Sequence, residues 1–291
     1  MSSPANVGDL TMALRRGDYL ADRGLATAAH VAMSLHRPLL LEGEPGVGKT
    51  EIAKVLAGVL GRDLIRLQCY EGIDTNQALY EWDYARQLLH IRALSERGLA
   101  DESAVDRLFG PRFLLERPLL QALRAGDRAV LLIDEIDRAD DEFEAFLLEM
   151  LSDFQISIPE VGTIVAEKPP IVILTSNRTR ELHDALKRRC MYHWIDYPSL
   201  EQEIEIVTVR QPGVSVELAS KVVQAVHRLR EMDLAKPPGV AETIDWARTL
   251  EFLGETTLTA ESAEFTLGSV LKEREDIELA KENIDEITSV T

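Results

Sequence analysis

The stretch LEGEPGVGKTEIAK, from Leu41 to Lys54, decides the fold. Its core matches the pattern G-x-x-x-x-G-K-[ST], between an apolar run at 38–41 and a helical pattern at 49–60. A strand before the glycines and a helix after them is the setting of a phosphate-binding loop, which disfavours a glycine-rich turn without a ligand. Backbone N–H groups and the helix N-terminus would surround the phosphate oxygens. The predicted phosphate-binding residues are Gly43, Glu44, Pro45, Gly46, Val47, Gly48, Lys49 and Thr50.

Two further apolar runs end in polar residues that suit the same chemistry. Val130-Leu-Leu-Ile is followed by Asp134 and Glu135, and the run at 171–175 is followed by Asn177. Thr50 and Asp134 are predicted to hold Mg²⁺, while Glu135 would act as the general base that polarises the attacking water. Asn177 could orient that water from the other side. GTPases are disfavoured because no N-K-x-D sequence for guanine recognition occurs.

The order of the apolar runs predicts the fold class. Short runs at 38–41, 64–69, 129–133, 171–175 and 192–196 alternate with helical patterns, as expected for a parallel sheet buried on both faces. Only helical patterns follow residue 198, at 200–210, 216–232, 243–252 and 260–274. We therefore expect an α/β, three-layer P-loop core followed by a small all-α domain. The predicted division is a flexible leader at 1–17, the nucleotide-binding domain at 18–198 and the helical domain at 199–291.

The composition of the chain limits the classes of ligand and partner that it is expected to bind. The formal net charge of −18 disfavours nucleic acid, whose binding relies on basic side chains that neutralise phosphates. The two cysteines, Cys69 and Cys190, lack the spacing of zinc ligands. No apolar run has the length of a signal peptide core or of a membrane span, so the chain is expected to be cytoplasmic, with membrane association only through a partner.

Taken together, the three strand ends resemble those of AAA+ ATPases, and the blocks GEPGVGKTEIAK, LIRLQCYEGID, VLLIDEIDRADDEFEAFLLEMLSD and PPIVILTSNRTRELHDALKRRC resemble the MoxR family within them. The likeness is greatest to the branch associated with molybdenum-containing carbon monoxide dehydrogenases. It implies an ATPase that uses ATP and Mg²⁺, forms a homo-oligomeric, hexameric ring, and acts as a chaperone that matures a client metalloenzyme. It also implies a partner with a von Willebrand factor A domain.

Three alternatives to this function stay open. The same mechanism could serve another client, rubisco or nitric oxide reductase, as in other MoxR-like activators. A nucleic-acid motor or loader is a different class, which the acidic charge and the lack of an appended DNA-binding module disfavour. A scaffold that binds ATP without turnover is disfavoured by the intact Lys49, Asp134 and Glu135.

The resemblance also assigns arginines. It places an arginine finger, which acts on the neighbouring subunit's ATP, at Arg189, with Arg188 as the second candidate. The spacing alone favours two solvated cations at a helix end instead. At the position of the family's sensor 2 arginine this sequence has Asp245, so Arg248, three residues later, is the candidate for that role.

Two segments are predicted to face a client. Residues 71–98, which include Tyr80, Trp82 and Tyr84, occupy the place of the family's helix-2 insert, and residues 154–165 alternate as in a hairpin. For Trp82, client contact and core packing are equally favoured. The family stacks adenine near Leu25, for which ordinary core packing is an equal explanation.

Overall fold

The computed structural model describes residues 4–96, 107–159 and 161–289. A five-stranded sheet forms its centre, in the order β2-β5-β8-β1-β9, and all the neighbouring strands are parallel. The strands are β1 (Leu39–Gly43), β2 (Asp63–Gln68), β5 (Ala129–Asp134), β8 (Ile171–Ser176) and β9 (Met191–Ile195). All five predicted strands are therefore confirmed, each to within one or two residues.

The strand order brings the three predicted strand ends together. Strand β8 lies between β1 and β5, with Glu42 opposite Ser176 and Ile133 opposite Leu174. Because parallel strands share one direction, the phosphate loop after β1, the carboxylates after β5 and Asn177 after β8 all lie at the carboxyl edge of the sheet.

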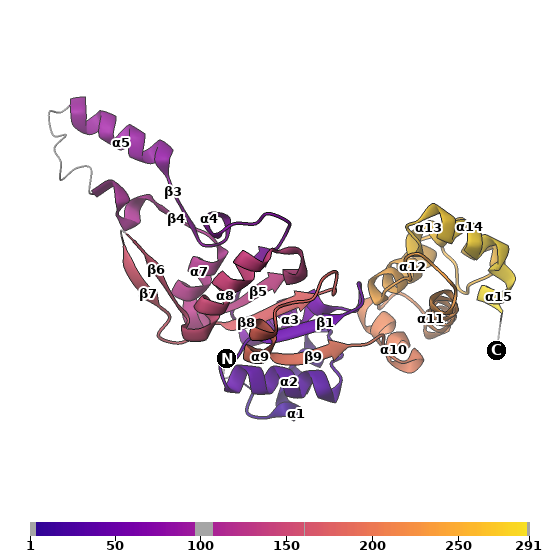
Figure 1. Ribbon diagram of the computed structural model, residues 1–291. Helices are drawn as coiled ribbons and strands as arrows, with labels where there is room; N and C mark the ends of the chain where they lie inside the picture. Colours follow the sequence, from indigo (N-terminus) through magenta and orange to yellow (C-terminus); the bar gives the residue numbers. More distant parts are fainter. Residues whose placement is uncertain (1–3, 97–106, 160, 290–291) are drawn as a thin grey trace.

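Helices cover both faces of the sheet, which gives the predicted three layers (Figure 1). Alternate strand residues face opposite ways, so Leu39 and Leu41 pack with one set of helices and Leu40 with the other. One layer contains α1 (Val7–Arg16), α2 (Arg23–Ser34) and α3 (Lys49–Leu60). The other contains α7 (Pro118–Ala125), α8 (Asp141–Asp153) and α9 (Asp184–Arg189).

Helix α1 corrects the prediction of a flexible leader at 1–17. From Val7 the chain is helical, and the side chains of Leu10 and Leu14 are fully buried against α2 and α3. The prediction is wrong although the signal is local: Asn6 caps the helix, Leu10 and Leu14 repeat at a spacing of four residues, and two arginines lie in the last turn.

Two hairpins leave the core on the α7–α8 side. Strands β3 (Tyr80–Trp82) and β4 (Leu114–Glu116) pair antiparallel, and α5 (Tyr84–Glu96) projects from them in Figure 1. The return strand β4 therefore extends the insert beyond its predicted end at 98. Trp82 is buried, with its ring edge-on to Phe109, so core packing accounts for it. The second hairpin, β6 (Gln155–Ile158) and β7 (Gly162–Val165), forms within the predicted 154–165. Shorter elements are α4 (Thr75–Ala78), η1 (Arg107–Phe109), η2 (Pro111–Phe113), η3 (Gly126–Arg128) and η4 (Ile136–Arg138).

A helical region with a core of its own follows β9. It contains α10 (Leu200–Arg210), α11 (Val216–Glu231), α12 (Val240–Phe252), α13 (Ala260–Val270), α14 (Arg274–Glu282) and α15 (Ile284–Thr288). The sequence predicted one helix across 260–274, whereas the structure ends α13 at Val270 and starts α14 at Arg274. Within the residues described, no helix is both long enough and apolar enough to cross a membrane.

Candidate nucleotide-binding site

The phosphate loop begins where β1 ends and leads into α3. Gly48 precedes the first residue of the helix in the left-handed conformation (φ 94°), which glycine adopts without steric cost. Lys49 is buried, and its Nζ donates to the carbonyl oxygens of Gly43 and Glu44 at 2.7 Å each. Burial lowers the pKa of Lys49, against the opposing effect of four nearby carboxylates, of which Asp137 acts most strongly. The loop therefore holds its lysine among backbone carbonyls at the start of a helix, as a phosphate site requires.

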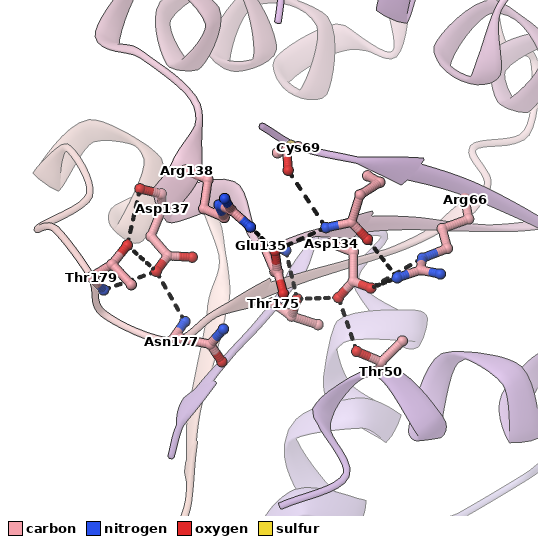
Figure 2. Close-up of polar contacts among 11 residues, drawn as sticks. Thr50, Arg66, Cys69, Asp134, Glu135, Asp137, Arg138, Thr175, Asn177 and Thr179 are labelled. Atoms are coloured by element: carbon pink, nitrogen blue, oxygen red, sulfur yellow. Dashed lines mark hydrogen bonds and ion pairs between the residues drawn. The ribbon is translucent and has the colours of Figure 1, made fainter. Parts of the chain in front are cut away.

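Asp134 is the centre of a polar network at the carboxyl edge (Figure 2). Its Oδ1 accepts hydrogen bonds from the hydroxyls of Thr50, at 2.9 Å, and Thr175. Its Oδ2 accepts from Nε and Nη2 of Arg66 at 3.1 and 2.6 Å. The side chain of Asp134 is 3% exposed and that of Arg66 49%. The predicted pair of Thr50 and Asp134 thus meets directly, and it presents the hard oxygen donors that suit Mg²⁺.

Glu135, the predicted base, follows Asp134 and adopts a left-handed backbone conformation (φ 55°). Its N–H donates to the hydroxyl of Thr175 at 2.9 Å. Its Oε2 accepts from Nε2 of Gln68 at 3.0 Å and from Nη1 of Arg138 at 3.2 Å. The carboxylate is therefore held at the sheet edge by one amide and one guanidinium group.

Asn177 lies at the end of β8, where the sequence placed it. Its backbone N–H donates to Oδ2 of Asp137 at 3.2 Å, and the N–H of Thr179 donates to the same oxygen at 2.9 Å (Figure 2). Asp137 is buried. It fixes the chain after β8 beside the segment that carries Glu135, so these bonds position Asn177 through its backbone.

A cavity of about 620 Å³ adjoins the phosphate loop. Its walls come from the α1–α2 connection, the loop itself, the end of β9, α10 and the first turn of α12, and they include Leu25, the predicted adenine contact. Arg248, the sensor 2 candidate, is exposed on α12 and is not a lining residue. The residues of α12 that do line the cavity are Val240, Ala241 and Ile244. The structure therefore does not bring Arg248 to the site.

The first turn of α12 touches the phosphate loop through two glycines. A Cβ atom on Gly239 would lie 2.7 Å from Cα of Gly46 and 2.7 Å from the carbonyl oxygen of Pro45. The N–H of Ala241 donates to the carbonyl of Gly46 at 3.3 Å. The loop and the helical region thus meet backbone against backbone.

Arg188 and Arg189 lie at the opposite edge of the sheet from the phosphate loop. They end α9 just before β9 begins, and the register pairs Met191 with Leu39 and Ile195 with Gly43. Four residues of strand separate the two edges by about 13 Å, so this pair does not reach the loop of its own chain. Both side chains are exposed and have no hydrogen-bond or ion-pair partner among residues 4–96, 107–159 and 161–289.

Sequence reasoning missed Arg66, Gln68 and Thr175. Gln68 ends β2, so it is a further polar residue at a strand end, and the argument applied to Asn177 could have found it. Arg66 lies on β2 opposite Leu132 and bonds a residue 68 positions away, which no local pattern reveals.

Residues 38–190, more than half of the chain, match the model of the AAA domain, dynein-related subfamily. The chain belongs to this family. The β2-β5-β8-β1-β9 sheet is accordingly the P-loop core of an AAA+ protein, followed by a helical region.

The chain is also similar to curated proteins. Over 188 residues the chain is 29% identical to the uncharacterized protein YehL of Escherichia coli strain K12, covering 61% of this chain and 46% of YehL. Over 233 residues it is 28% identical to protein CbbQ of Hydrogenophilus thermoluteolus, covering 75% of this chain and 73% of CbbQ. The chain thus spans less than half the length of the first of these relatives. Among solved structures, a point mutant of Thermotoga maritima RuvB aligns with a TM-score of 0.49 at 17% identity, over 84% of this chain and 67% of that one.

Proposed function

We propose that this AAA domain protein hydrolyses ATP at a site shared between two copies of the chain, as a MoxR-type remodelling ATPase. The observation that carries the proposal is the meeting of Thr50, Asp134 and Glu135 beside the phosphate loop. A carboxylate held there by two donors supports turnover rather than nucleotide binding alone, because it can accept a proton from the attacking water.

Each of these residues has a role in the proposed reaction. Lys49 exchanges its two backbone carbonyls for phosphate oxygens when ATP binds, because a buried ammonium group favours an anionic partner. Thr50 and Asp134 would hold Mg²⁺, which supplies charge neutralisation at the phosphates. Phosphate oxygens and water would complete the ligand set, because Mg²⁺ in proteins is held by one or two carboxylates together with substrate phosphates and retains several waters. Glu135 accepts a proton from the attacking water, and Asn177 orients that water.

The position of Arg188 and Arg189 supports a ring-shaped assembly of several copies of the chain. Arg188 and Arg189 face solvent at the edge of the sheet away from their own phosphate loop, so either can act only on the ATP of another copy. A head-to-tail contact of this kind gives a ring when its rotation closes, and we propose a closed hexamer. An arginine in this position stabilises negative charge on the transferring phosphoryl group.

The test replaces the base. Glu135→Gln should lower ATP turnover by about 100-fold or more while ATP still binds, since a general base contributes roughly 10²–10⁴. Phosphate release measures turnover, and fluorescent-nucleotide titration measures binding. Glu149→Gln, an exposed carboxylate on α8, is the control. Wild-type turnover in Glu135→Gln would contradict the assignment of the base.

The client is a proposal from resemblance alone. We propose a metalloenzyme similar to molybdenum-containing carbon monoxide dehydrogenase, working with a partner that carries a von Willebrand factor A domain; rubisco or nitric oxide reductase are the alternatives. The Glu135→Gln protein, loaded with ATP, should retain its client in co-sedimentation with each purified candidate. Turnover that rises with added DNA, and falls again with salt, would contradict a protein client.

A further inference from the structure

Arg37 contacts the end of the helix that carries the arginine pair. Its Nε donates to the carbonyl oxygen of Arg189 at 3.0 Å, and its Nη2 donates to those of Arg188, at 2.7 Å, and Cys190, at 3.1 Å. These are the last carbonyls of α9, which have no partner within the helix. One guanidinium group therefore binds three consecutive carbonyls and adds positive charge where the helix dipole is negative.

The position of Arg37 is fixed by the end of α2. His36 adopts a left-handed conformation (φ 51°), and the N–H of Arg37 donates to the carbonyl of Ala32 at 2.9 Å. This six-to-one bond is the mark of a Schellman motif, which ends a helix in a defined turn. The carbonyl oxygen of the next residue, Pro38, accepts a hydrogen bond from the N–H of Met191 at 2.8 Å. Two successive residues thus anchor the junction of α9 and β9 on both its sides.

In the part of the chain that the structure describes, the guanidinium group of Arg37 forms no ion pair. Across residues 4–96, 107–159 and 161–289 no carboxylate forms an ion pair with it. A lysine could not reproduce its contacts, because an ammonium group is a point charge without the planar fork of donors. Its geometry is specific to the backbone that bears Arg188 and Arg189.

We propose that Arg37 is a positioning residue that holds the arginine pair for action on the neighbouring subunit's ATP; this rests on the shared site proposed above. Helix α9 has only six residues and a single fully buried side chain, Leu186, so it has little packing to fix its last turn. Releasing the three carbonyls frees that turn. A displacement of about 1 Å at a catalytic group can cost about 100-fold in rate.

The experiment measures turnover of mixed assemblies. Arg37→Ala should lower ATP turnover by about 10–100-fold, and Arg37→Lys should lower it less, with nucleotide binding unchanged in both. Each is then mixed in equal amounts with Glu135→Gln, which supplies an intact arginine pair but no base. By random assortment about a quarter of head-to-tail interfaces then combine an intact base with an intact pair. Turnover should rise toward that share of the wild-type value.

Two further variants distinguish the possible results of this experiment. Arg62→Ala, beside the same small cavity at the amino edge of the sheet as Arg37, is the control and should keep wild-type turnover. Arg189→Ala, mixed with Glu135→Gln, should regain turnover in the same way. If it regains turnover and neither Arg37 variant does, Arg37 supports its own subunit's fold and the inference is refuted. If Arg189→Ala does not regain turnover, the shared site itself is contradicted.

Discussion

The buried carboxylate of Glu203 is expected to dominate the stability of the helical region. Nη1 and Nη2 of Arg230 donate to its two oxygens at 2.7 and 2.8 Å, the hydroxyl of Thr243 donates at 2.6 Å, and Nε2 of His227 lies 3.0 Å away. The carboxylate joins three helices, and the guanidinium also stacks on Tyr197, a wall of the cavity, at 4.3 Å.

Glu203→Ala leaves a guanidinium that is 9% exposed without its counter-charge. Removing one partner of a buried pair costs about 3–5 kcal/mol, whereas a region of this size has a total stability of about 5–14 kcal/mol. With a urea m-value of about 2 kcal/mol/M, the unfolding midpoint should fall by about 2 M. Trp246 is fully buried in the same region, so its fluorescence, measured in a background in which Trp82 and Trp194 are replaced by phenylalanine, reports the transition.

A surface pair supplies the control. Arg274 and Glu278 form an exposed ion pair on α14, so Glu278→Ala should change stability by less than about 1 kcal/mol. If the midpoint for Glu203→Ala falls by no more than that of Glu278→Ala, the buried network contributes no more than a surface contact. The reasoning from burial would then be refuted.

Two more predictions concern the carboxyl edge and the thiols. Thr175→Val removes the buried hydroxyl between the Asp134 carboxylate and the Glu135 amide, so we expect a loss of about 2–4 kcal/mol in thermal or urea unfolding and slower ATP turnover. Unchanged stability would mean that water replaces the hydroxyl. Burial raises the pKa of Cys69 and of Cys190 to about 12, from 9.0, so at pH 8 each thiolate is about 1,000-fold rarer than in a free thiol. Iodoacetamide should therefore label both only after unfolding, as mass spectrometry would show; rapid labelling of the native protein would contradict their burial.

The sequence predicted those features whose signal is local. Buried parallel strands appear as short apolar runs, and the glycine pattern with Lys49 and Thr50 marks the loop whatever surrounds it. The fold class and the proximity of Asp134 to Thr50 follow from these signals. The break after Val270 was missed because Leu271 and the residues beside it continue a helical pattern while the chain turns.

Features that depend on tertiary contacts could not be predicted from the sequence. Arg37 bonds carbonyls more than 150 positions away, and Arg66 reaches a carboxylate 68 positions along the chain. Only the strand order places these groups together. Arg248 illustrates the converse: its spacing on a helix suggested a role, but a residue two turns beyond Val240 is carried past the cavity.

The contact between Gly46 and Gly239 bears on how nucleotide could move the helical region. Because neither residue has a side chain, the two backbones are in direct contact, with the carboxylate of Glu242 beside them, so a shift of the loop backbone would displace the start of α12. The contact depends on both glycines, because a Cβ atom on Gly239 would lie 2.7 Å from Cα of Gly46 and one on Gly46 would lie 3.0 Å from Cα of Gly239. It couples the loop to the helical region through the backbone, independently of the side chain at Asp245.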